Sequence, residues 1–294
     1  MGSPLPKRLS AAADLSATHL KKSPRSQQLA KLTELALHNA ESLLQAVQFC
    51  ANHEIGSFRV NSKILPLKTH PELGYDISDL PESAEIIKRF RAVGEFAQKH
   101  NIRTLFHPDQ FVVLSSPRPD VVEKSLVEIE YQAQVATWIN ADIINVHGGG
   151  GYNDKAAALK RFAAAAQRLS GQARKLLSVE NDDITYSPSE LLPLCQKLQI
   201  PLVYDVHHHR CLPDELSLEA ATQAALSTWN REPLMHISSP KHGWGDGACR
   251  PHHDYIALSD FPKIWQNLEI TVEVEAKAKE LAVLQLKKEL QARR

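Results

Sequence analysis

Residues 118 to 149 read RPDVVEKSLVEIEYQAQVATWINADIINVHGG and join two kinds of pattern. The first part, residues 118 to 139, has helical character, and Pro119 suits the first turn of a helix. The second part, IINVHGG at residues 143 to 149, is apolar without strict alternation, as in strands that are covered on both faces in a parallel sheet. This stretch therefore predicts a helix followed by a buried strand that ends at His147.

The same alternation recurs along the chain. Apolar runs predict strands at residues 57–61, 102–108, 143–149, 176–182, 202–208, 233–239 and 270–276. Helical stretches at residues 83–100 and 155–169 lie between them, and Pro188 suits a further helix start. Strands that alternate with helices predict a βαβ architecture with right-handed crossovers. No proline- or glycine-rich linker divides the chain, so we predict one folded domain.

The fold class that follows is α/β, a TIM-like (β/α)8 barrel whose first strand is missing or degenerate. A barrel runs to about 250 residues, so 294 residues suffice for one with tails. The first predicted helix covers roughly residues 26–53, and an eight-stranded barrel needs a strand before it. Nothing in residues 1–25 has a strand pattern. We therefore expect an irregular basic N-terminal tail (1–25), a barrel domain (26–280) and a C-terminal helical tail (281–294). An open barrel would expose two strand edges.

Composition places the chain among ordinary folded proteins. It is 43% hydrophobic and 23% charged, which excludes disordered, collagen-like and disulfide-scaffold proteins. No run approaches the roughly 18 apolar residues of a membrane span, and the N-terminus lacks the apolar centre of a secretory signal. We expect a cytoplasmic protein whose four cysteines are reduced. The 34 basic and 34 acidic side chains cancel, which gives no evidence for a nucleic-acid partner, and 14 histidines come on top.

Polar residues at the predicted strand ends carry the functional signal. Each is a histidine or a carboxylate: His107, His147, Glu180, Asp205 with His207 to His209, His236 and Glu275. A lone histidine at the end of a strand is more often structural. The carboxyl ends of barrel strands, however, converge on one face, so these side chains can meet at one site. Several buried carboxylates and imidazoles together are costly unless cations pair with them. A nitrogen and oxygen mixture without thiolate suits Mn²⁺, Zn²⁺ or Fe²⁺ better than Mg²⁺ or Ca²⁺. More than four candidate ligands imply more than one ion.

Loops add weaker candidates. His70, His252 and His253 follow predicted strands, although a loop histidine alone is more often a surface residue. The glycine run at residues 148–151 fits neither a dinucleotide nor a phosphate loop. No nucleophile elbow or catalytic-cysteine signature is visible, so the pattern favours metal-assisted chemistry. Hydrolysis and sugar isomerisation both stay open at this point.

Eight ordered motifs resemble those of the UV damage endonuclease family: FRVNSKILPLKTHPELGY, LFHPDQFVVLSS, NVHGGGGYNDK, SVENDD, VYDVHHHR, MHISSPK, HHDYI and VEAKAKE. The similarity covers roughly residues 28–280. That family is similar to endonuclease IV in having a β/α barrel with a cluster of divalent ions, usually manganese. The resemblance implies an enzyme that nicks double-stranded DNA 5′ to cyclobutane dimers and 6-4 photoproducts and so starts excision repair.

Site residues follow from the resemblance position by position. The implied metal ligands are His107, His147, Glu180, Asp205, His208, His236, His252 and Glu275. They would hold three divalent ions, manganese first and zinc or magnesium as alternatives, with Glu180 as a bridging carboxylate. Glu180 and His70 are the implied catalytic residues, His70 as a ligand or as a group behind the ligands. Gln110 and Phe111 would enter the duplex at the lesion, where an aromatic wedge replaces lost stacking.

At two positions the family motifs and the residue periodicity lead to different predictions. Strand alternation pairs Asp205 with His207, whereas the family pattern pairs Asp205 with His208; we prefer the latter and expect the strand to end at Asp205. Phe111, taken with its apolar neighbours alone, would be placed in the core.

The sequence also departs from the family. Leu234 stands where some relatives carry a lysine, and the chain starts MGSPLPKRLSAAADLSATHL in place of a strand of the type RLGY. We expect a missing first strand, through a late start site or a deletion.

Two other functions compete with the nuclease. One is a sugar isomerase or epimerase of the xylose isomerase-like group, whose sites need one or two ions held mainly by carboxylates. The other is a lesion-binding protein that is inactive because its barrel is incomplete. As partners we expect damaged double-stranded DNA, no membrane and no obligate protein, with the chain a monomer.

Overall fold

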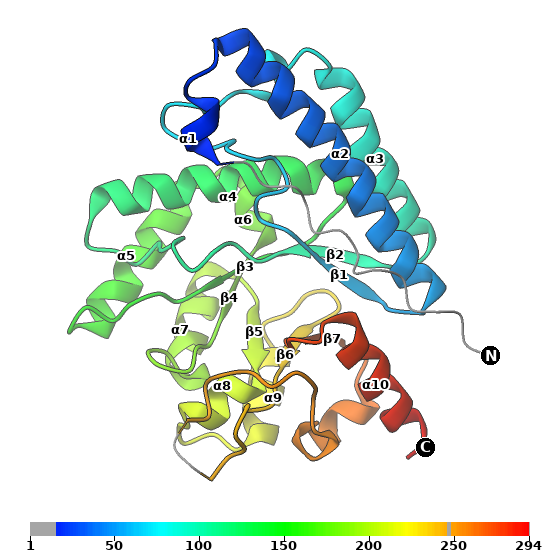
Figure 1. Cartoon of the computed structure of the whole chain (residues 1–294). Helices are drawn as coiled ribbons and strands as arrows, with labels where there is room; N and C mark the ends of the chain where they lie inside the picture. The colour runs from blue at the N-terminus through cyan, green and yellow to red at the C-terminus, as the bar shows by residue number, and fades with distance from the viewer. Residues whose placement is uncertain (1–15, 246–247, 294) are drawn as a thin grey trace. The chain divides into compact units, whose positions relative to one another are not determined.

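The computed structural model describes residues 16–245 and 248–293 (Figure 1). It contains two compact units. The first comprises Met1–Asp109 and Val127–Ile144, and the second comprises Gln110–Leu126 and Asn145–Arg294. Among the described residues, no helix combines the length and the apolar character needed to cross a bilayer.

Seven parallel strands follow one another in chain order in the sheet, from β1 to β7. They are β1 (Ser57–Val60), β2 (Arg103–Phe106), β3 (Ile144–His147), β4 (Leu177–Glu180), β5 (Leu202–Asp205), β6 (Leu234–Ile237) and β7 (Thr271–Val274). Every residue of β4, β5 and β6 is buried, which explains why these strands are apolar without alternation. All seven predicted strands are confirmed.

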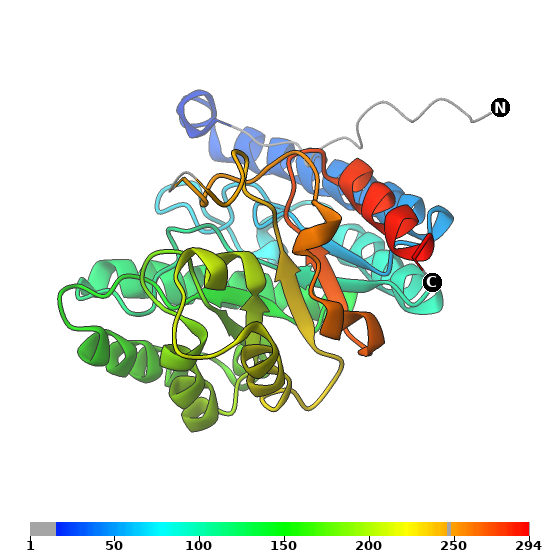
Figure 2. The ribbon, with the colours of Figure 1, turned by 90° about the horizontal axis from the view of Figure 1, so that it is seen from below.

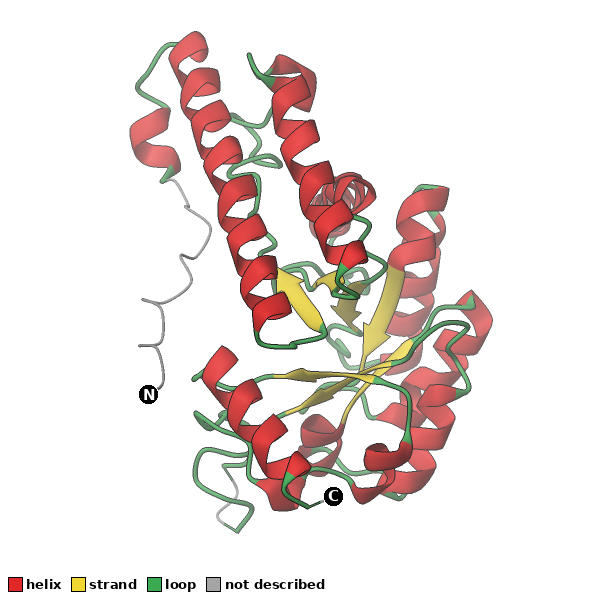
Figure 3. Cartoon of the chain, turned by 90° about the vertical axis from the view of Figure 1, so that its right-hand side faces the viewer, coloured by secondary structure: helices red, strands yellow, loops and turns green. Residues whose placement is uncertain are grey.

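Helices dominate the first unit. These are α1 (Ala17–Leu20), α2 (Arg25–Asn52), η1 (Ile77–Asp79) and α3 (Ser83–Lys99), together with the part of α4 (Pro119–Ile139) that starts at residue 127. Of these, α2 and α3 are long, with 28 and 17 residues. Figures 1 and 3 show α2 and α3 side by side. Gly94 lets α3 approach α4 closely, because a Cβ at this position would lie 2.6 Å from the carbonyl carbon of Ile139. The helices predicted at 26–53, 83–100 and 118–139 are confirmed.

The second unit continues the alternation with shorter helices. They are α5 (Lys155–Gln167), α6 (Gly171–Leu176), α7 (Pro188–Leu198), α8 (Val206–Cys211), α9 (Leu218–Leu226), η2 (Leu258–Asp260), η3 (Lys263–Asn267) and α10 (Glu280–Gln291). Side chains of Asp154, Ser170 and Ser217 cap α5, α6 and α9. Pro119 and Pro188 open α4 and α7, as predicted.

The C-terminal helix covers the last strand. Figure 2 shows α10, in red, beside the orange segment that contains η2. An apolar pocket between this helix and β7 is lined by Val272 and Val274 from the strand and by Val283, Leu286 and Leu290 from α10. The helix therefore protects one side of a strand that ends the sheet.

The N-terminal part of the chain bears on the predicted missing strand. Within residues 16–25 the structure contains α1 and the start of α2 and no strand, so β1 is the first strand of the described chain. Residues 1–15, where the rest of the predicted tail falls, lie outside the described residues. The domain boundaries at 25 and 280 stay a prediction.

Candidate metal centre

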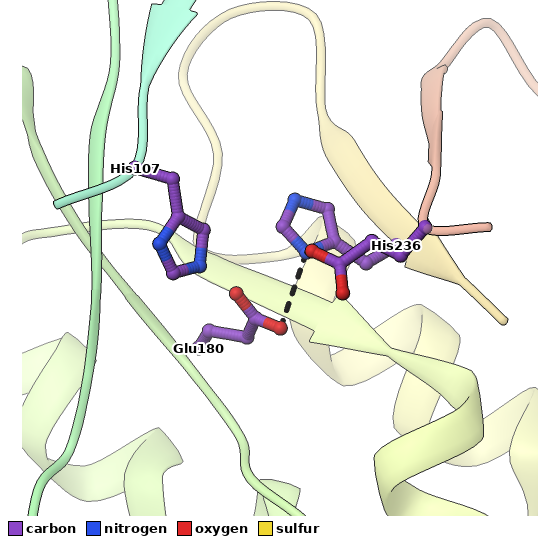
Figure 4. Close-up of side chains that lie close together, drawn as sticks. His107, Glu180 and His236 are labelled. Atoms are coloured by element: carbon purple, nitrogen blue, oxygen red, sulfur yellow. Dashed lines mark ion pairs between the residues drawn. The ribbon is translucent and has the colours of Figure 1, made fainter. Parts of the chain in front are cut away.

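Glu180 is the last residue of β4 and is fully buried. Asn145, on β3, donates its side-chain N–H to Oε2 of this carboxylate, which fixes its orientation. The other oxygen, Oε1, lies 3.1 Å from Nδ1 of His236 and 3.4 Å from Nδ1 of His208. Figure 4 shows the ion pair between Glu180 and His236. One carboxylate oxygen thus faces two imidazole rings.

His236 lies on β6 among three carboxylates. Its Nδ1 is 3.5 Å from Oε1 of Glu275, and its Nε2 is 2.9 Å from Oε2 of Glu273. Strand register explains the contact with Glu273, because the two residues are direct partners across β6 and β7. Burial alone would lower the pKa of His236, but the charges of Glu180 and Glu273 outweigh it and raise that pKa well above its usual value.

Asp205 and His208 lie where β5 turns directly into α8. Asp205 ends the strand, and its Oδ1 accepts the backbone N–H of His208, which caps the helix. Nδ1 of His208 lies 3.6 Å from Oδ2 of Asp205 and 2.9 Å from the carbonyl oxygen of Asn181. Burial opposes protonation of His208, yet Asp205 and Glu180 raise its pKa well above the usual value. The predicted strand end at Asp205 is confirmed, and His208 contacts Asp205 as the predicted pairing requires.

The spacing of these donors fits divalent cations. Donor atoms that share an ion at about 2.1 Å lie roughly 3 to 3.6 Å apart at octahedral or tetrahedral angles. Glu180, His236 and Glu275 form one such group, and Glu180, Asp205 and His208 form a second, with donor atoms within 4.8 Å of one another in each. Among the described residues, Oδ2 of Asp205 is buried without a hydrogen-bond donor. A buried carboxylate of this kind is costly unless a cation compensates it.

Two further predicted ligands belong to the same unit. His252 lies 3.2 Å from Oγ of Ser238 and 3.8 Å from Oε2 of Glu275, both measured from Nδ1. His147 ends β3, and its ring centroid is 6.0 Å from that of His208. The second unit therefore contains the predicted ligands other than His107.

His107 and His70 belong to the first unit. His107 directly follows β2 and is half-buried, with Nδ1 3.1 Å from the carbonyl oxygen of Pro108. Nδ1 of His70 accepts the backbone N–H groups of Glu72 and Leu73 at 3.1 and 3.2 Å. An imidazole that accepts at Nδ1 in its neutral form carries its proton on Nε2.

Gln110 and Phe111 follow β2 in the loop that belongs to the second unit, and both are exposed. Phe111 is 76% exposed, so the placement in the core that its apolar neighbours suggest is wrong.

Three supporting residues were missed by the sequence interpretation. Glu273 orients His236, Asn145 holds Glu180, and Asn181 exchanges two hydrogen bonds with the backbone of Asp205, each at 2.9 Å. Glu273 was detectable, because it is two residues from Glu275 and period-two alternation along an extended chain puts both side chains on one face. The asparagines give a weaker signal, namely an amide within or directly after a buried strand.

The three consecutive histidines have separate surroundings. His207 is buried with its ring centroid 5.1 Å from that of His252, while His209 lies between Tyr204 and Asp214. Its Nδ1 is 2.8 Å from the Tyr204 hydroxyl and its Nε2 is 2.9 Å from Oδ1 of Asp214. Burial tends to raise the pKa of Asp214, but hydrogen bonds from backbone N–H groups and from His209 outweigh it and lower the pKa to about 2. Of the three histidines, His208 is the one that faces Glu180 and Asp205.

Comparison with known proteins gives a consistent result. The sequence matches the family model UV-endonuclease UvdE over residues 7–294. A UV DNA damage endonuclease of Bacillus mycoides (strain KBAB4) is 34% identical over 290 residues, which cover 94% of this chain and 88% of the relative. The crystal structure of SacUVDE matches with a TM-score of 0.85 at 26% identity, covering 97% of this chain and 94% of that one. Endonuclease IV from Thermus thermophilus shares the fold, with a TM-score of 0.61 at 16% identity over 86% of this chain and 95% of that one.

Parallel strands in chain order, with helices between them and a buried group of histidines and carboxylates that could hold a metal ion at their ends, define a protein of the β/α-barrel class. Within this class, the chain belongs to the UV-endonuclease UvdE family. The predicted assignment to the UV damage endonucleases is thereby confirmed, and the sugar isomerase alternative is not supported by the family match.

Proposed function

We propose that this protein hydrolyses the phosphodiester bond immediately 5′ to cyclobutane dimers and 6-4 photoproducts in double-stranded DNA. The observation that carries the proposal is the position of Glu180, whose single oxygen Oε1 faces both His236 and His208 at 3.1 and 3.4 Å. A carboxylate shared by two ligand groups is suited to bridge two cations. The UV DNA damage endonuclease of Bacillus mycoides supports the substrate class.

We assign the eight predicted ligands to three divalent ions, with manganese as the first candidate and zinc or magnesium as alternatives. Bound cations of this kind stabilise the charge that develops on a phosphate and make water a better nucleophile. The chain's contribution is orientation: Asn145 holds Glu180, and Glu273 holds His236. His107, His147 and His252 complete the proposed set. The position of His147 at the end of β3, with its ring centroid 6.0 Å from that of His208, supports its place in the set.

His70 is proposed as a catalytic residue that donates a hydrogen bond. Because its Nδ1 accepts two backbone N–H groups, the ring proton lies on Nε2 and is available to a phosphate oxygen or to the leaving 3′ oxygen. Gln110 and Phe111 are proposed to enter the duplex at the lesion, and the exposure of Phe111 supports this role.

Damaged duplex DNA is the proposed partner, and we propose that the protein acts on it as a monomer in the cytoplasm, at the nucleoid. The bacterial source of the Bacillus relative supports this location, because bacterial DNA lies in the cytoplasm. We propose no obligate protein partner and no membrane association.

The deciding experiment uses a duplex that contains one defined cyclobutane dimer. With Mn²⁺, we expect a nick directly 5′ to the dimer and none in the undamaged duplex, and replacing Mn²⁺ by Zn²⁺ or Mg²⁺ tests the metal assignment. Glu180→Gln keeps the size of the side chain but removes the charge, and we expect it to abolish nicking. Normal nicking by this variant would refute the site. Binding of the lesion by the wild-type protein without a nick would support an inactive lesion-binding protein.

A further inference from the structure

Trp244 is an exposed aromatic residue whose orientation is fixed. It lies in the loop after β6 and is 40% exposed. Its indole N–H donates to Oδ1 of Asp260 at 2.9 Å, and Asp260 is buried and also accepts the hydroxyl of Ser239. An indole that is anchored at its polar edge and still 40% exposed is preorganised for contact with a flat partner.

A cation accompanies the ring. The guanidinium of Arg210 lies 5.4 Å from the ring centroid of Trp244, and Arg210 donates to the carbonyl oxygen of Asp260 at 2.9 Å. Asp260 thus positions both side chains, one through its carboxylate and one through its backbone. Proteins that bind single-stranded nucleic acids commonly use an aromatic ring next to a guanidinium: bases stack on the ring, and the guanidinium adds a favourable positive charge.

The ring lies close to the proposed ligands. The imidazole of His207 is 5.3 Å from Trp244 and 5.1 Å from His252, in both cases between ring centroids. One buried side chain therefore separates the exposed indole from a residue proposed to hold a cation. A nucleotide stacked on Trp244 would therefore lie near the cation that His252 is proposed to hold.

We infer that Trp244 is a stacking platform for a nucleobase of the DNA at the cleavage site, with Arg210 supplying positive charge to the adjoining backbone. The inference rests on the proposed function and adds a residue that contacts substrate. A photoproduct weakens base pairing around it, so bases near the lesion leave the helix at lower cost and can stack on protein rings. Every base offers such a face, so the contact contributes affinity without reading sequence.

Trp229 provides a matched control. Its indole N–H donates to the carbonyl oxygen of Leu202 at 2.8 Å, and the guanidinium of Arg231 lies 5.4 Å from its ring centroid. As with Trp244, an indole held by a hydrogen bond lies beside a guanidinium, but Leu202 is the first residue of β5, at the amino ends of the strands. The candidate ligands lie at the carboxyl ends, where barrel enzymes have their active sites.

The test is a titration of tryptophan fluorescence with a duplex that carries one cyclobutane dimer and a phosphorothioate at the phosphate to be cut, in Mn²⁺. Trp138 and Trp265 are buried, so stacking should quench the wild-type signal mainly through Trp244. We expect Trp244→Phe to lose most of the quench while it keeps its affinity within about threefold, because a phenyl ring still stacks. Trp244→Ala should bind roughly five- to a hundredfold more weakly. Trp229→Phe should keep both the quench and the affinity.

The outcomes separate the two proposals. If the wild-type protein binds and nicks the damaged duplex but Trp244→Phe keeps the full quench, or Trp244→Ala keeps full affinity, the stacking role is overturned and the nuclease stands. A wild-type protein that does not distinguish damaged from undamaged duplex would overturn both. Thermal unfolding of each variant controls for folding, and Trp244→Phe still decides the question if Trp244→Ala fails to fold.

Discussion

At the scale of single residues, Glu273 is the side chain behind a proposed ligand. Its Oε2 lies 2.9 Å from Nε2 of His236, on the side of the ring opposite to Glu180. Such a carboxylate fixes the ring and increases its basicity, and losing it typically weakens metal binding about 10- to 100-fold. We expect Glu273→Gln to lower the affinity for Mn²⁺ by roughly tenfold, as measured by calorimetric titration of the chelator-treated protein.

An exposed glutamate near the same strand serves as the control for this change. Glu269 lies outside the site, just before β7, and Glu269→Gln removes the same charge from the chain. This variant should bind Mn²⁺ like the wild-type protein. Equal affinities for both variants would show that Glu273 does not support the site.

At the scale of elements, the contact of α3 with α4 depends on a glycine. A Cβ on Gly94 would lie 2.6 Å from the carbonyl carbon of Ile139 and 2.8 Å from its Cα, so the backbones would have to separate. We expect Gly94→Ala to destabilise the protein by about 1–3 kcal/mol, although alanine is the better helix former. Calorimetry should show a melting temperature lower by several degrees.

Replacing a second glycine by alanine, at a position where the added Cβ meets no neighbouring atom, serves as the control for Gly94→Ala. Gly171 opens α6, and a Cβ there would meet nothing within 4 Å. Gly171→Ala should leave the melting temperature unchanged or raise it slightly, because it restricts the unfolded chain. A similar loss of stability in both variants would exclude the close helix contact as the cause.

At the scale of the whole molecule, the formal charge of zero omits bound cations. Three divalent ions, as proposed, would add about six positive charges at the face that meets phosphate. Without them the carboxylates of Glu180, Asp205 and Glu275 would repel the DNA backbone. We expect chelation to weaken binding of the phosphorothioate duplex by on the order of tenfold or more, and added Mn²⁺ to restore it, as measured by fluorescence anisotropy.

The same experiment needs a check on folding. Circular dichroism of the chelated protein should show that its helices persist, so that the lost affinity reflects charge. Unchanged binding after chelation would contradict the idea that cations supply the positive field.

Much of the fold was predictable because buried parallel strands leave a clear trace. Runs such as LVYD at residues 202–205 are apolar on both faces, and prolines at 119 and 188 mark helix starts. The histidines and carboxylates at the strand ends, which we propose as ligands, followed from the same pattern. Strand periodicity alone chose the wrong histidine beside Asp205, because the chain changes to a helix at the next residue.

Other features depend on contacts that no local pattern encodes. Phe111 is followed by two valines yet exposed, since burial is decided by what packs on the loop. Trp244 lies in a loop without periodicity, and the partner that fixes it, Asp260, is distant in sequence. The division of the chain into two compact units also lacks a sequence signal, because no linker marks it.

The direct passage from β5 into α8 has a consequence for how the histidine triplet evolves. A helix turns by about 100° per residue, so neighbouring rings in one turn point in three directions, toward Trp244, Glu180 and Tyr204 respectively. Inserting or deleting one residue in this turn would rotate the following rings by about 100°, so that an imidazole would face the group that its neighbour faces now. Two chains can therefore both contain three consecutive histidines and differ in whether the middle ring faces the carboxylates of Glu180 and Asp205. The rotation of the first turn of α8 relative to β5 is the property that has to be preserved.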